Sequence, residues 1–324
     1  MKWIVLLFCV LLIGCQETPA QPAAGSTPSA PEFEEIALET SPTLESTVTI
    51  LSEKIGERNL NHYPKLEQTR DYITRRLKKA GYEVELDEFK VDQPVYNLVF
   101  TKPGNEEILV IGAHYDSAPI TPGANDNGSG VAVLLQLAER LKQVPMERTV
   151  RFVFFVNEEP PYFMGESMGS RVYAKRCAER KDKIVGMISL ETMGYYSDVE
   201  GSQMFPPGIE GYPNTGNFLA FISEPNSQEF LQECLDHFQG LPVESLVAPA
   251  SIEGVSWSDH ASFWEHGFPG VMVTDTAPFR YPHYHRKTDT ADQLDYQKLG
   301  LAADGLETMI RFLGRAEGLP GDQP

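Results

Sequence analysis

The chain has 324 residues, with 27 Lys and Arg against 46 Asp and Glu, so its formal net charge is −19. This balance excludes a nucleic-acid binder that works through a basic surface, and it argues against electrostatic docking on anionic lipid. A hydrophobic fraction of 41% is ordinary for a globular protein, and four cysteines are too few for a disulfide-dense scaffold.

The first 14 residues have the pattern of a signal peptide. Met1 and Lys2 form a short positive head, and an apolar run follows over residues 3–13. This run is too short to span a bilayer as a stable helix. The sequence Leu-Ile-Gly-Cys at 12–15 resembles the lipobox of bacterial lipoproteins, which implies cleavage before Cys15 and lipidation of its thiol. We therefore expect anchoring in the cell envelope, on the periplasmic or extracellular face. An ordinary secretory signal is the alternative.

A tether and one folded domain are expected after the signal. Residues 15–36 are rich in Pro, Ser and Ala and have few large apolar side chains, which is typical of an unfolded linker. Residues 37–324 show no internal repeat and no second linker, so we assign them to one domain. Only Cys177 and Cys234 remain free to pair in the mature chain, and either a disulfide or two buried thiols would fit.

The predicted elements of this domain alternate between helix and strand. Residues 43–54 and 63–80 are predicted helices, and Gly81 ends the second. Polar and apolar residues alternate over 82–89, as in a half-buried edge strand. An amphipathic helix is predicted over 129–142. Continuous apolar runs, typical of strands covered on both faces, occupy residues 97–100, 108–113, 150–156, 184–190 and 270–274. This alternation predicts an α/β domain with a largely parallel, helix-covered sheet.

Acidic and imidazole side chains stand directly after several of these strands. The residues in these positions are His114, Asp116, Glu158, Glu159 and Glu191. Asp126 lies in the Gly-rich loop 123–130, which follows the first of these strands. Sites in such sheets form beyond the carboxyl ends of the strands, so we expect these groups to meet at one edge. Burying so many carboxylates together is very costly unless cations neutralise them, so the pattern predicts a metal site.

The types of ligand indicate which metal is bound. The candidate ligands offer nitrogen and oxygen but no thiolate, which favours Zn²⁺, with Co²⁺ or Mn²⁺ as alternatives. Several carboxylates with two histidines could hold two ions about 3.5–4 Å apart, bridged by one carboxylate and a water.

Five motifs in order resemble the family-28 metallopeptidases, which include secreted di-zinc aminopeptidases and glutaminyl cyclases. The motifs are His-Tyr-Asp at 114–116, Gly-Ala-Asn-Asp-Asn-Gly-Ser-Gly at 123–130, Glu-Glu at 158–159, Ser-Asp-His at 258–260 and His-x-x-x-Asp-Thr at 285–290. The resemblance covers about residues 45–315. It implies the zinc-dependent exopeptidase fold, a three-layer α-β-α sandwich with a mixed, mostly parallel sheet, and a catalytic domain over residues 37–324.

The resemblance also implies roles for individual residues. Glu158 would be the general base and acid, Asp116 would accept a hydrogen bond from the ring of His114, and Tyr284 would support an oxyanion. The peptide bond between Asp126 and Asn127 would be cis. Two Zn²⁺ ions, sharing Asp126, would be held by His114, Asp126, Glu159, Glu191 and His285.

Two ligand positions need comment. Many family aminopeptidases have Asp where Glu191 stands, and the extra methylene shifts the carboxylate by about one bond length. Glu is still an oxygen ligand, so Glu191 keeps its assignment. His283 lies two residues before His285, but the spacing to the following Asp-Thr favours His285.

Other polar and aromatic residues leave two interpretations open. Asp259 and His260 either shape the site through hydrogen bonds or form a structural pair. Loops 160–169 and 204–217 are expected at the mouth of the site. Their aromatic residues would form an apolar side-chain pocket or simply pack the loops; these are Tyr162, Phe163, Phe205 and Tyr212. Three further histidines, without ligand context, are interpreted as surface or structural, namely His62, His237 and His266.

Three functions fit this sequence. The first is a zinc-dependent aminopeptidase that removes N-terminal residues from peptides with a free N-terminus. The second is a glutaminyl cyclase with a single zinc, and the third is a metal-binding lipoprotein without chemistry. The complete ligand set, with His114, favours the peptidase, and Glu158 argues against a pure binder. We expect a monomer that binds no nucleic acid and reaches the membrane through Cys15.

Overall fold

The computed structural model describes residues 36–315. The chain divides into two units, Met1–Glu34 and Glu35–Pro324, and the description below concerns the second. The predicted signal peptide, Cys15 and the tether up to residue 35 lie outside the described residues. Across the described range, the helices are all too short or too polar to cross a membrane.

A mixed eight-stranded sheet forms the centre of the domain, in the order β1-β2-β4-β3-β5-β8-β6-β7. Strands β4, β3, β5 and β8 run parallel to one another, and β7 is parallel to β6. Strands β1, β2 and β4 pair antiparallel, as do β6 and β8. The strands are β1 (Glu85–Lys90), β2 (Pro94–Lys102), β3 (Glu107–His114), β4 (Thr149–Phe155), β5 (Lys183–Glu191), β6 (Leu219–Ser223), β7 (Val243–Val247) and β8 (Gly270–Thr274).

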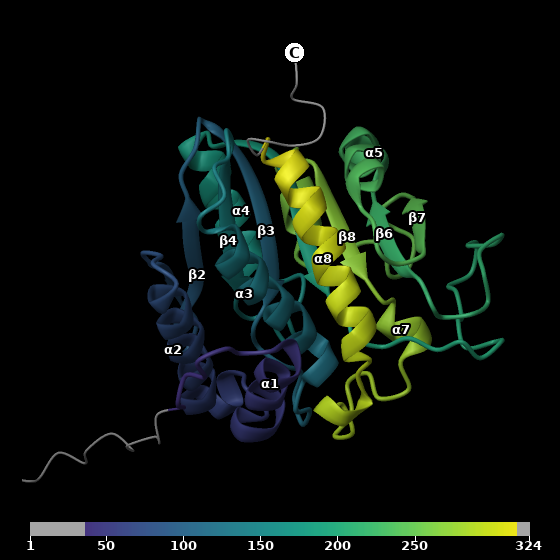
Figure 1. The fold of residues 1–324 in the computed structure, drawn as a ribbon, viewed down its shortest axis with the longest axis horizontal. Coiled ribbons are helices and arrows are strands. Elements are labelled where there is room, and N and C mark those ends of the chain that lie inside the picture. Colours follow the sequence, from purple (N-terminus) through teal and green to yellow (C-terminus); the bar gives the residue numbers. More distant parts are fainter. Residues whose placement is uncertain (1–35, 316–324) are drawn as a thin grey trace, which may run out of the picture. The chain divides into compact units, whose positions relative to one another are not determined.

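Helices cover both faces of this sheet. The α-helices are α1 (Leu44–Thr49), α2 (Tyr63–Lys79), α3 (Gly130–Leu141), α4 (Gly169–Arg180), α5 (Gln228–His237), α6 (His260–Trp264), α7 (Ala277–Arg280) and α8 (Tyr296–Leu313). Shorter turns and helical segments are η1 (Ile50–Ile55), η2 (Leu60–His62), η3 (Ala124–Ser129), η4 (Pro225–Ser227) and η5 (Ala291–Gln293). Figure 1 shows α3 and α8 lying across one face of the strands.

The alternation of side chains along each strand separates the two cores. On β3, Leu109 and Ile111 pack in the core that includes α1, α2, α3, α5 and α8. The alternating residues Ile108 and Val110 pack on the opposite face, in a second core that includes Tyr173 of α4 and Phe263 of α6. Because neighbouring side chains of a strand point to opposite faces, one apolar run supplies both cores. This confirms the predicted three-layer sandwich with a mixed, mostly parallel sheet.

The predicted elements are present in the structure, but three long helices, α4, α5 and α8, and two strands at one side of the sheet were not predicted. The expected helix over 43–54 is α1 continued by η1, and Thr43 caps it by accepting a hydrogen bond from the Ser46 amide at 3.0 Å. The expected edge strand is β1, which begins later, at Glu85. The expectation of six strands is wrong, because β6 and β7 were missed. Both have only five residues, and β7 is a half-exposed edge strand.

The two remaining cysteines form no disulfide in the described structure. Cys177 lies on α4 and Cys234 on α5, and both thiols are free and buried. Burial raises the pKa of Cys177 to about 12, which keeps the thiol protonated and unreactive. Of the two interpretations, the structure therefore supports two buried thiols.

Helix α8 packs closely at Gly305, which gives a test of the fold. A methyl group at Gly305 would meet the backbone carbonyl of Gln239, which cannot move aside, and the ring of Phe238 at 2.7 Å. A methyl group at Gly300, on the same helix, would meet nothing within 4 Å. We expect Gly305→Ala to lower the free energy of unfolding by about 1–3 kcal/mol. Gly300→Ala should raise it by about 0.5–1 kcal/mol. Urea denaturation measures both, and equal shifts in the two variants would contradict this packing.

Candidate metal centre

The predicted ligands meet at the carboxyl edge of the parallel strands. His114 is the last residue of β3 and Glu191 the last of β5. Glu158 and Glu159 follow β4 after a short turn, and Asp126 lies in η3. His285 comes from the loop between α7 and η5. The strand-end pattern predicts this meeting for the residues from His114 to Glu191, and the resemblance implies it for His285, more than 150 residues after His114.

Asp126 lies between the two histidines. Its Oδ1 atom is 3.2 Å from Nε2 of His114, and its Oδ2 atom is 3.0 Å from Nε2 of His285. On the first side, Oε2 of Glu191 lies 3.4 Å from His114 Nε2. On the second side, Oε2 of Glu159 lies 3.2 Å from His285 Nε2. The two oxygens of one carboxylate therefore face two separate sets of ligand atoms.

These residues form two groups that could each hold a metal ion. One group is His114, Asp126 and Glu191; the other is Asp126, Glu159 and His285; within each, the ligand atoms lie within 4.8 Å of one another. A third group of the same kind contains Glu158 in place of Asp126, with His114 and Glu159. The shared Asp126 is the feature expected of a bridging ligand.

Burial and crowding strongly affect the charges of this cluster. Burial raises the pKa of Glu159 to about 7, and Asp126 adds to the effect. Burial also raises the pKa of Glu158 well above its usual value. Burial opposes ionisation of Asp126 as well, but the attraction of the two neighbouring imidazoles outweighs it and holds the Asp126 pKa far below its usual value. A cluster of this kind is stabilised by added positive charge.

The donor atoms of this cluster fit a metal ion. Both ring nitrogens of His114, Nε2 of His285 and Oε1 of Glu159 are buried and make no hydrogen bond within the described structure. Orphaned buried polar atoms of this kind are rare unless an ion or water satisfies them. Imidazole nitrogen and carboxylate oxygen without thiolate are ligands that suit zinc.

Asp289 fixes the backbone that carries Asp126, a role the sequence analysis did not assign. Its two carboxylate oxygens accept hydrogen bonds from the amides of Asn125 and Asp126, at 2.8 and 3.2 Å. The hydroxyl of Tyr281 donates to the same carboxylate at 2.9 Å. The peptide bond between Asp126 and Asn127 is cis, as the resemblance implied.

Arg58 is a second residue that sequence reasoning missed. The side chain is fully buried, and its guanidinium donates to the carbonyls of Tyr115, Pro122 and Gly123 at 2.8, 2.6 and 2.8 Å. These carbonyls belong to the loop that connects His114 to Asp126. Arg58 stands outside the five motifs, so no local pattern points to it.

The role predicted for Asp116 needs a correction. Its Oδ1 atom lies 3.6 Å from Nδ1 of His114, which is too long for a hydrogen bond. The carboxylate instead accepts hydrogen bonds from the backbone amides of Glu158 and Glu159, each at 3.2 Å. Asp116 therefore fixes the main chain of these two glutamates, and the expected hydrogen bond to His114 is not formed.

Of the residues in the Ser-Asp-His motif, Ser258 contacts a candidate ligand directly. The Ser258 hydroxyl donates to Oε2 of Glu191 at 2.7 Å. Asp259 is fully buried, neither of its carboxylate oxygens has a hydrogen-bond partner within the described structure, and burial raises its pKa to about 7. His260 instead contacts the carbonyl of Val255 at 2.8 Å and packs edge-on against Trp264. The structural interpretation therefore holds for His260.

The other histidines lie away from this cluster. His283 contacts the Thr288 hydroxyl at 2.8 Å, so His285, two residues later, is the histidine that faces Asp126. His62 lies 3.4 Å from Glu57, and His237 stacks on Phe312. His266 is exposed.

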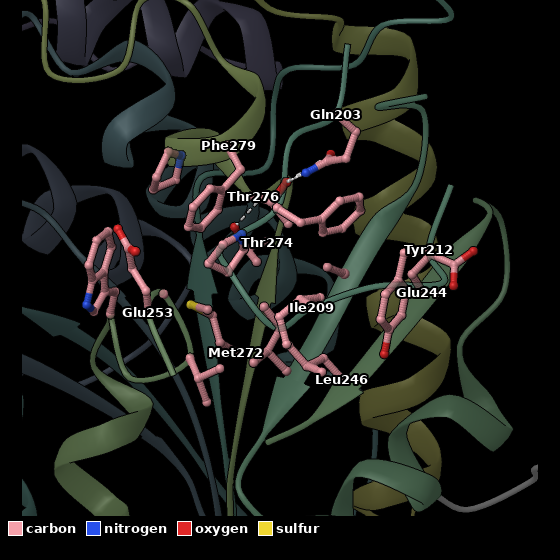
Figure 2. Close-up of a pocket in the computed structure, with 18 of the residues that line it drawn as sticks. Gln203, Ile209, Tyr212, Glu244, Leu246, Glu253, Met272, Thr274, Thr276 and Phe279 are labelled. Atoms are coloured by element: carbon pink, nitrogen blue, oxygen red, sulfur yellow. Dashed lines mark hydrogen bonds between the residues drawn. The ribbon is translucent and has the colours of Figure 1, made fainter. Parts of the chain in front are cut away.

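An apolar pocket opens beside Glu191 and Tyr284, both of which line it. It encloses about 750 Å³, including space open to solvent. Phe205 and Tyr212 belong to its walls, as expected if loop 204–217 forms an apolar pocket, whereas Tyr162 and Phe163 are not among the described lining residues. Figure 2 shows Ile209, Met272 and Leu246 close together within this pocket. The ring of Tyr284 stacks on His285 with centroids 3.9 Å apart, at the border between pocket and metal cluster.

Comparison with known proteins decides the family. A sequence model of peptidase family M28 matches residues 97–310. The chain belongs to this family. It is 35% identical to the uncharacterised protein YfbL of Escherichia coli K12, over 96% of this chain and 99% of that protein. Peptidase family M28 and the aminopeptidases among its relatives support a peptidase hydrolase.

Two relatives of this M28 chain that are named as aminopeptidases are less similar to it. Aminopeptidase YwaD of Bacillus subtilis is 29% identical over 63% of this chain and 41% of that protein. A probable lipoprotein aminopeptidase, LpqL of Mycobacterium tuberculosis, is 28% identical over 69% of this chain and 46% of that protein. The chain therefore spans less than half the length of these two relatives.

Solved structures share the fold of this M28 chain. The zinc aminopeptidase BSAP of Bacillus subtilis superposes with a TM-score of 0.68 at 16% identity, over 85% of this chain and 95% of that one. A glutaminyl cyclase of Fimbriiglobus ruber superposes with a TM-score of 0.61 at 21% identity, over 88% and 99%. The shared architecture includes both kinds of enzyme, so the fold does not choose between them.

Replacement of Arg58 tests its place in this centre. Arg58→Met would leave three buried carbonyls without a donor, so we expect the free energy of unfolding to fall by about 3 kcal/mol or more. Metal affinity should fall as well, because the loop that carries Asp126 loses its fixed position. Thermal unfolding and zinc titration measure the two effects. Arg171→Met, which removes an exposed ion pair with Glu265, is the control and should change stability by less than about 1 kcal/mol.

Proposed function

We propose that this protein is a zinc-dependent aminopeptidase that removes N-terminal residues from peptides. The observation that carries the proposal is the shared Asp126, whose two oxygens face His114 on one side and His285 on the other. Two complete ligand groups favour two metal ions, and a two-metal centre favours hydrolysis over the single-zinc cyclase. Zinc would be held by His114, Asp126, Glu159, Glu191 and His285.

Glu158 is the proposed general base and acid. Bound zinc supplies Lewis-acid polarisation of the scissile carbonyl and a water of lowered pKa. The Oε2 atom of Glu158 lies 3.9 Å from His114 Nε2, so the carboxylate stands beside the ligands. Burial raises the pKa of Glu158 well above its usual value, which makes the carboxylate a stronger proton acceptor and suits a group that takes a proton and then returns it to the leaving amine.

Tyr284 is the proposed donor to the developing oxyanion. Burial, with Asp126 next in effect, raises the pKa of the Tyr284 hydroxyl far above its usual value. The phenol therefore stays protonated at neutral pH and can donate a hydrogen bond to negative charge. The free amino group of the substrate would lie near Glu191, which also lines the pocket.

Glu158→Gln tests the base. The substitution keeps the size of the side chain but removes its basicity, so turnover of aminoacyl anilides should fall by about 10²–10⁴-fold. Bound zinc, measured by metal analysis, should remain at two ions per chain. Glu166→Gln, an exposed glutamate on the following loop, is the matched control and should retain activity. Full activity of the Glu158 variant would show that the base is elsewhere, and a single zinc in the wild type would favour the cyclase.

We also propose that a lipid at Cys15 holds the enzyme in the cell envelope. The lipobox-like sequence at 12–15 supports this, and a probable lipoprotein is among the relatives. Cys15→Ser should move the protein from the membrane fraction to the soluble fraction and abolish labelling by a radioactive fatty acid. Equal labelling of both forms would contradict the proposal.

A further inference from the structure

The pocket beside the metal cluster has a regular floor made by the sheet. Glu191 on β5 pairs in register with Thr274 on β8, Thr274 pairs with Ala220 on β6, and Ala220 pairs with Glu244 on β7. Directly paired residues point to the same face of a sheet, so these four side chains form one row. Three strand spacings place the Cα atoms of Glu191 and Glu244 about 14 Å apart.

The floor between the two glutamates is small and apolar. Thr274 and Ala220 occupy the middle of the row, and the next row on the same face pairs Met272, Ile222 and Leu246. Rings form part of the walls, among them Phe205 and Tyr212, whose centroids are 5.8 Å apart. A floor of this kind can accept the long apolar part of a substrate side chain that extends from Glu191 towards Glu244.

All the charged side chains among the described residues that line this pocket are acidic. Three glutamates line it, Glu191, Glu244 and Glu253, and no Lys, Arg or His is found among its described lining residues. Glu244 is half-buried, and no ion pair joins it to another described residue. The hydroxyl of Tyr212 donates to the carbonyl of Ser245 at 2.9 Å, which fixes the ring next to this strand. Figure 2 shows Tyr212 and Glu244 side by side, on the opposite side of the pocket from Glu253.

We propose that this pocket selects N-terminal Lys and Arg residues, with Glu244 as the counter-ion for their side chains. The inference rests on the proposed aminopeptidase function, in which the substrate amino group lies near Glu191. In an extended Lys residue, each of the two amino groups can donate a charge-assisted hydrogen bond. The two acceptor oxygens are then about 13 Å apart, close to the Cα separation of the two glutamates. The methylenes of the Lys side chain lie on the apolar floor, and the cation reaches Glu244 and the face of Tyr212.

The experiment compares Lys with norleucine, which has the same stem without the charge. For the zinc-loaded protein, kcat/KM is measured on the two aminoacyl-p-nitroanilides. We expect the wild type to prefer Lys, and Glu244→Gln to lower the Lys-to-norleucine ratio by roughly fivefold to tenfold while turnover of norleucine changes little. Glu229→Gln removes the same charge from an exposed position on α5 and should leave the ratio unchanged.

Two outcomes would overturn the assignment of Glu244. One is a wild type that prefers norleucine, and the other is a Glu244 variant with the wild-type ratio. If Glu229→Gln lowers the Lys-to-norleucine ratio of kcat/KM as much as Glu244→Gln does, the net charge of the protein, and not Glu244, attracts the cation.

A binding measurement separates this inference from the proposed function. Calorimetry on zinc-loaded Glu158→Gln compares lysinamide with norleucinamide, and it needs no turnover. Tighter binding of lysinamide that is lost with Glu244→Gln would support the pocket even if no anilide were cleaved, in which case only the aminopeptidase proposal fails. Equal binding of the two amides would overturn the pocket assignment whatever the activity.

Discussion

The structure of this site depends on one buried carboxylate that must stay ionised. Asp126 lies between two imidazoles, and the two candidate ligand groups share it. Asp289 holds the amide of Asp126, and Asp116 holds the amides of Glu158 and Glu159. Two carboxylates outside the two ligand groups thus fix the main chain of Asp126 and Glu159, and of Glu158 beside them. Hydrogen bonds to the backbone keep the acidic cluster in place.

Arg58 brings a positive charge close to this cluster without contacting the candidate ligands. Arg58 is buried behind the loop of Tyr115 to Gly123, yet it donates to carbonyl oxygens and forms no ion pair with a described carboxylate. Burial lowers the pKa of Arg58 to about 10, while Asp289 and Asp116 act to raise it, so the guanidinium remains charged at neutral pH. A direct contact with Asp126 would compete with a metal ion for that carboxylate. Arg58 therefore stabilises the loop without occupying its ligands.

Sequence predicts the features that depend on local pattern. His114 and Glu191 stand directly after apolar runs. Neighbouring parallel strands end at the same edge of a sheet, so such positions come together without further information about the fold. The functions of Arg58 and Asp289 could not be predicted, because each acts on the backbone of a segment about 60 or more residues away. Strand β7 was missed because a half-exposed edge strand of five residues lacks a continuous apolar run. The row from Glu191 to Glu244 follows only from the register of four strands.

The position of the pocket follows from where the helices end. On that face, α4 and α6 cover strands from β2 to β5 in one core. Beyond them, β6 and β8 pack against Phe205 and Ile252 of loops and against Trp264 at the end of α6, in a separate and smaller core. A helix would fill the space above the sheet with its regular side chains, whereas the loops over β6 and β7 leave it open. Because β8 joins these strands to β5, the open floor begins at Glu191, a residue of the candidate metal cluster. In the proposed aminopeptidase, the side chain of the substrate would therefore lie over the part of the sheet that the long helices leave open.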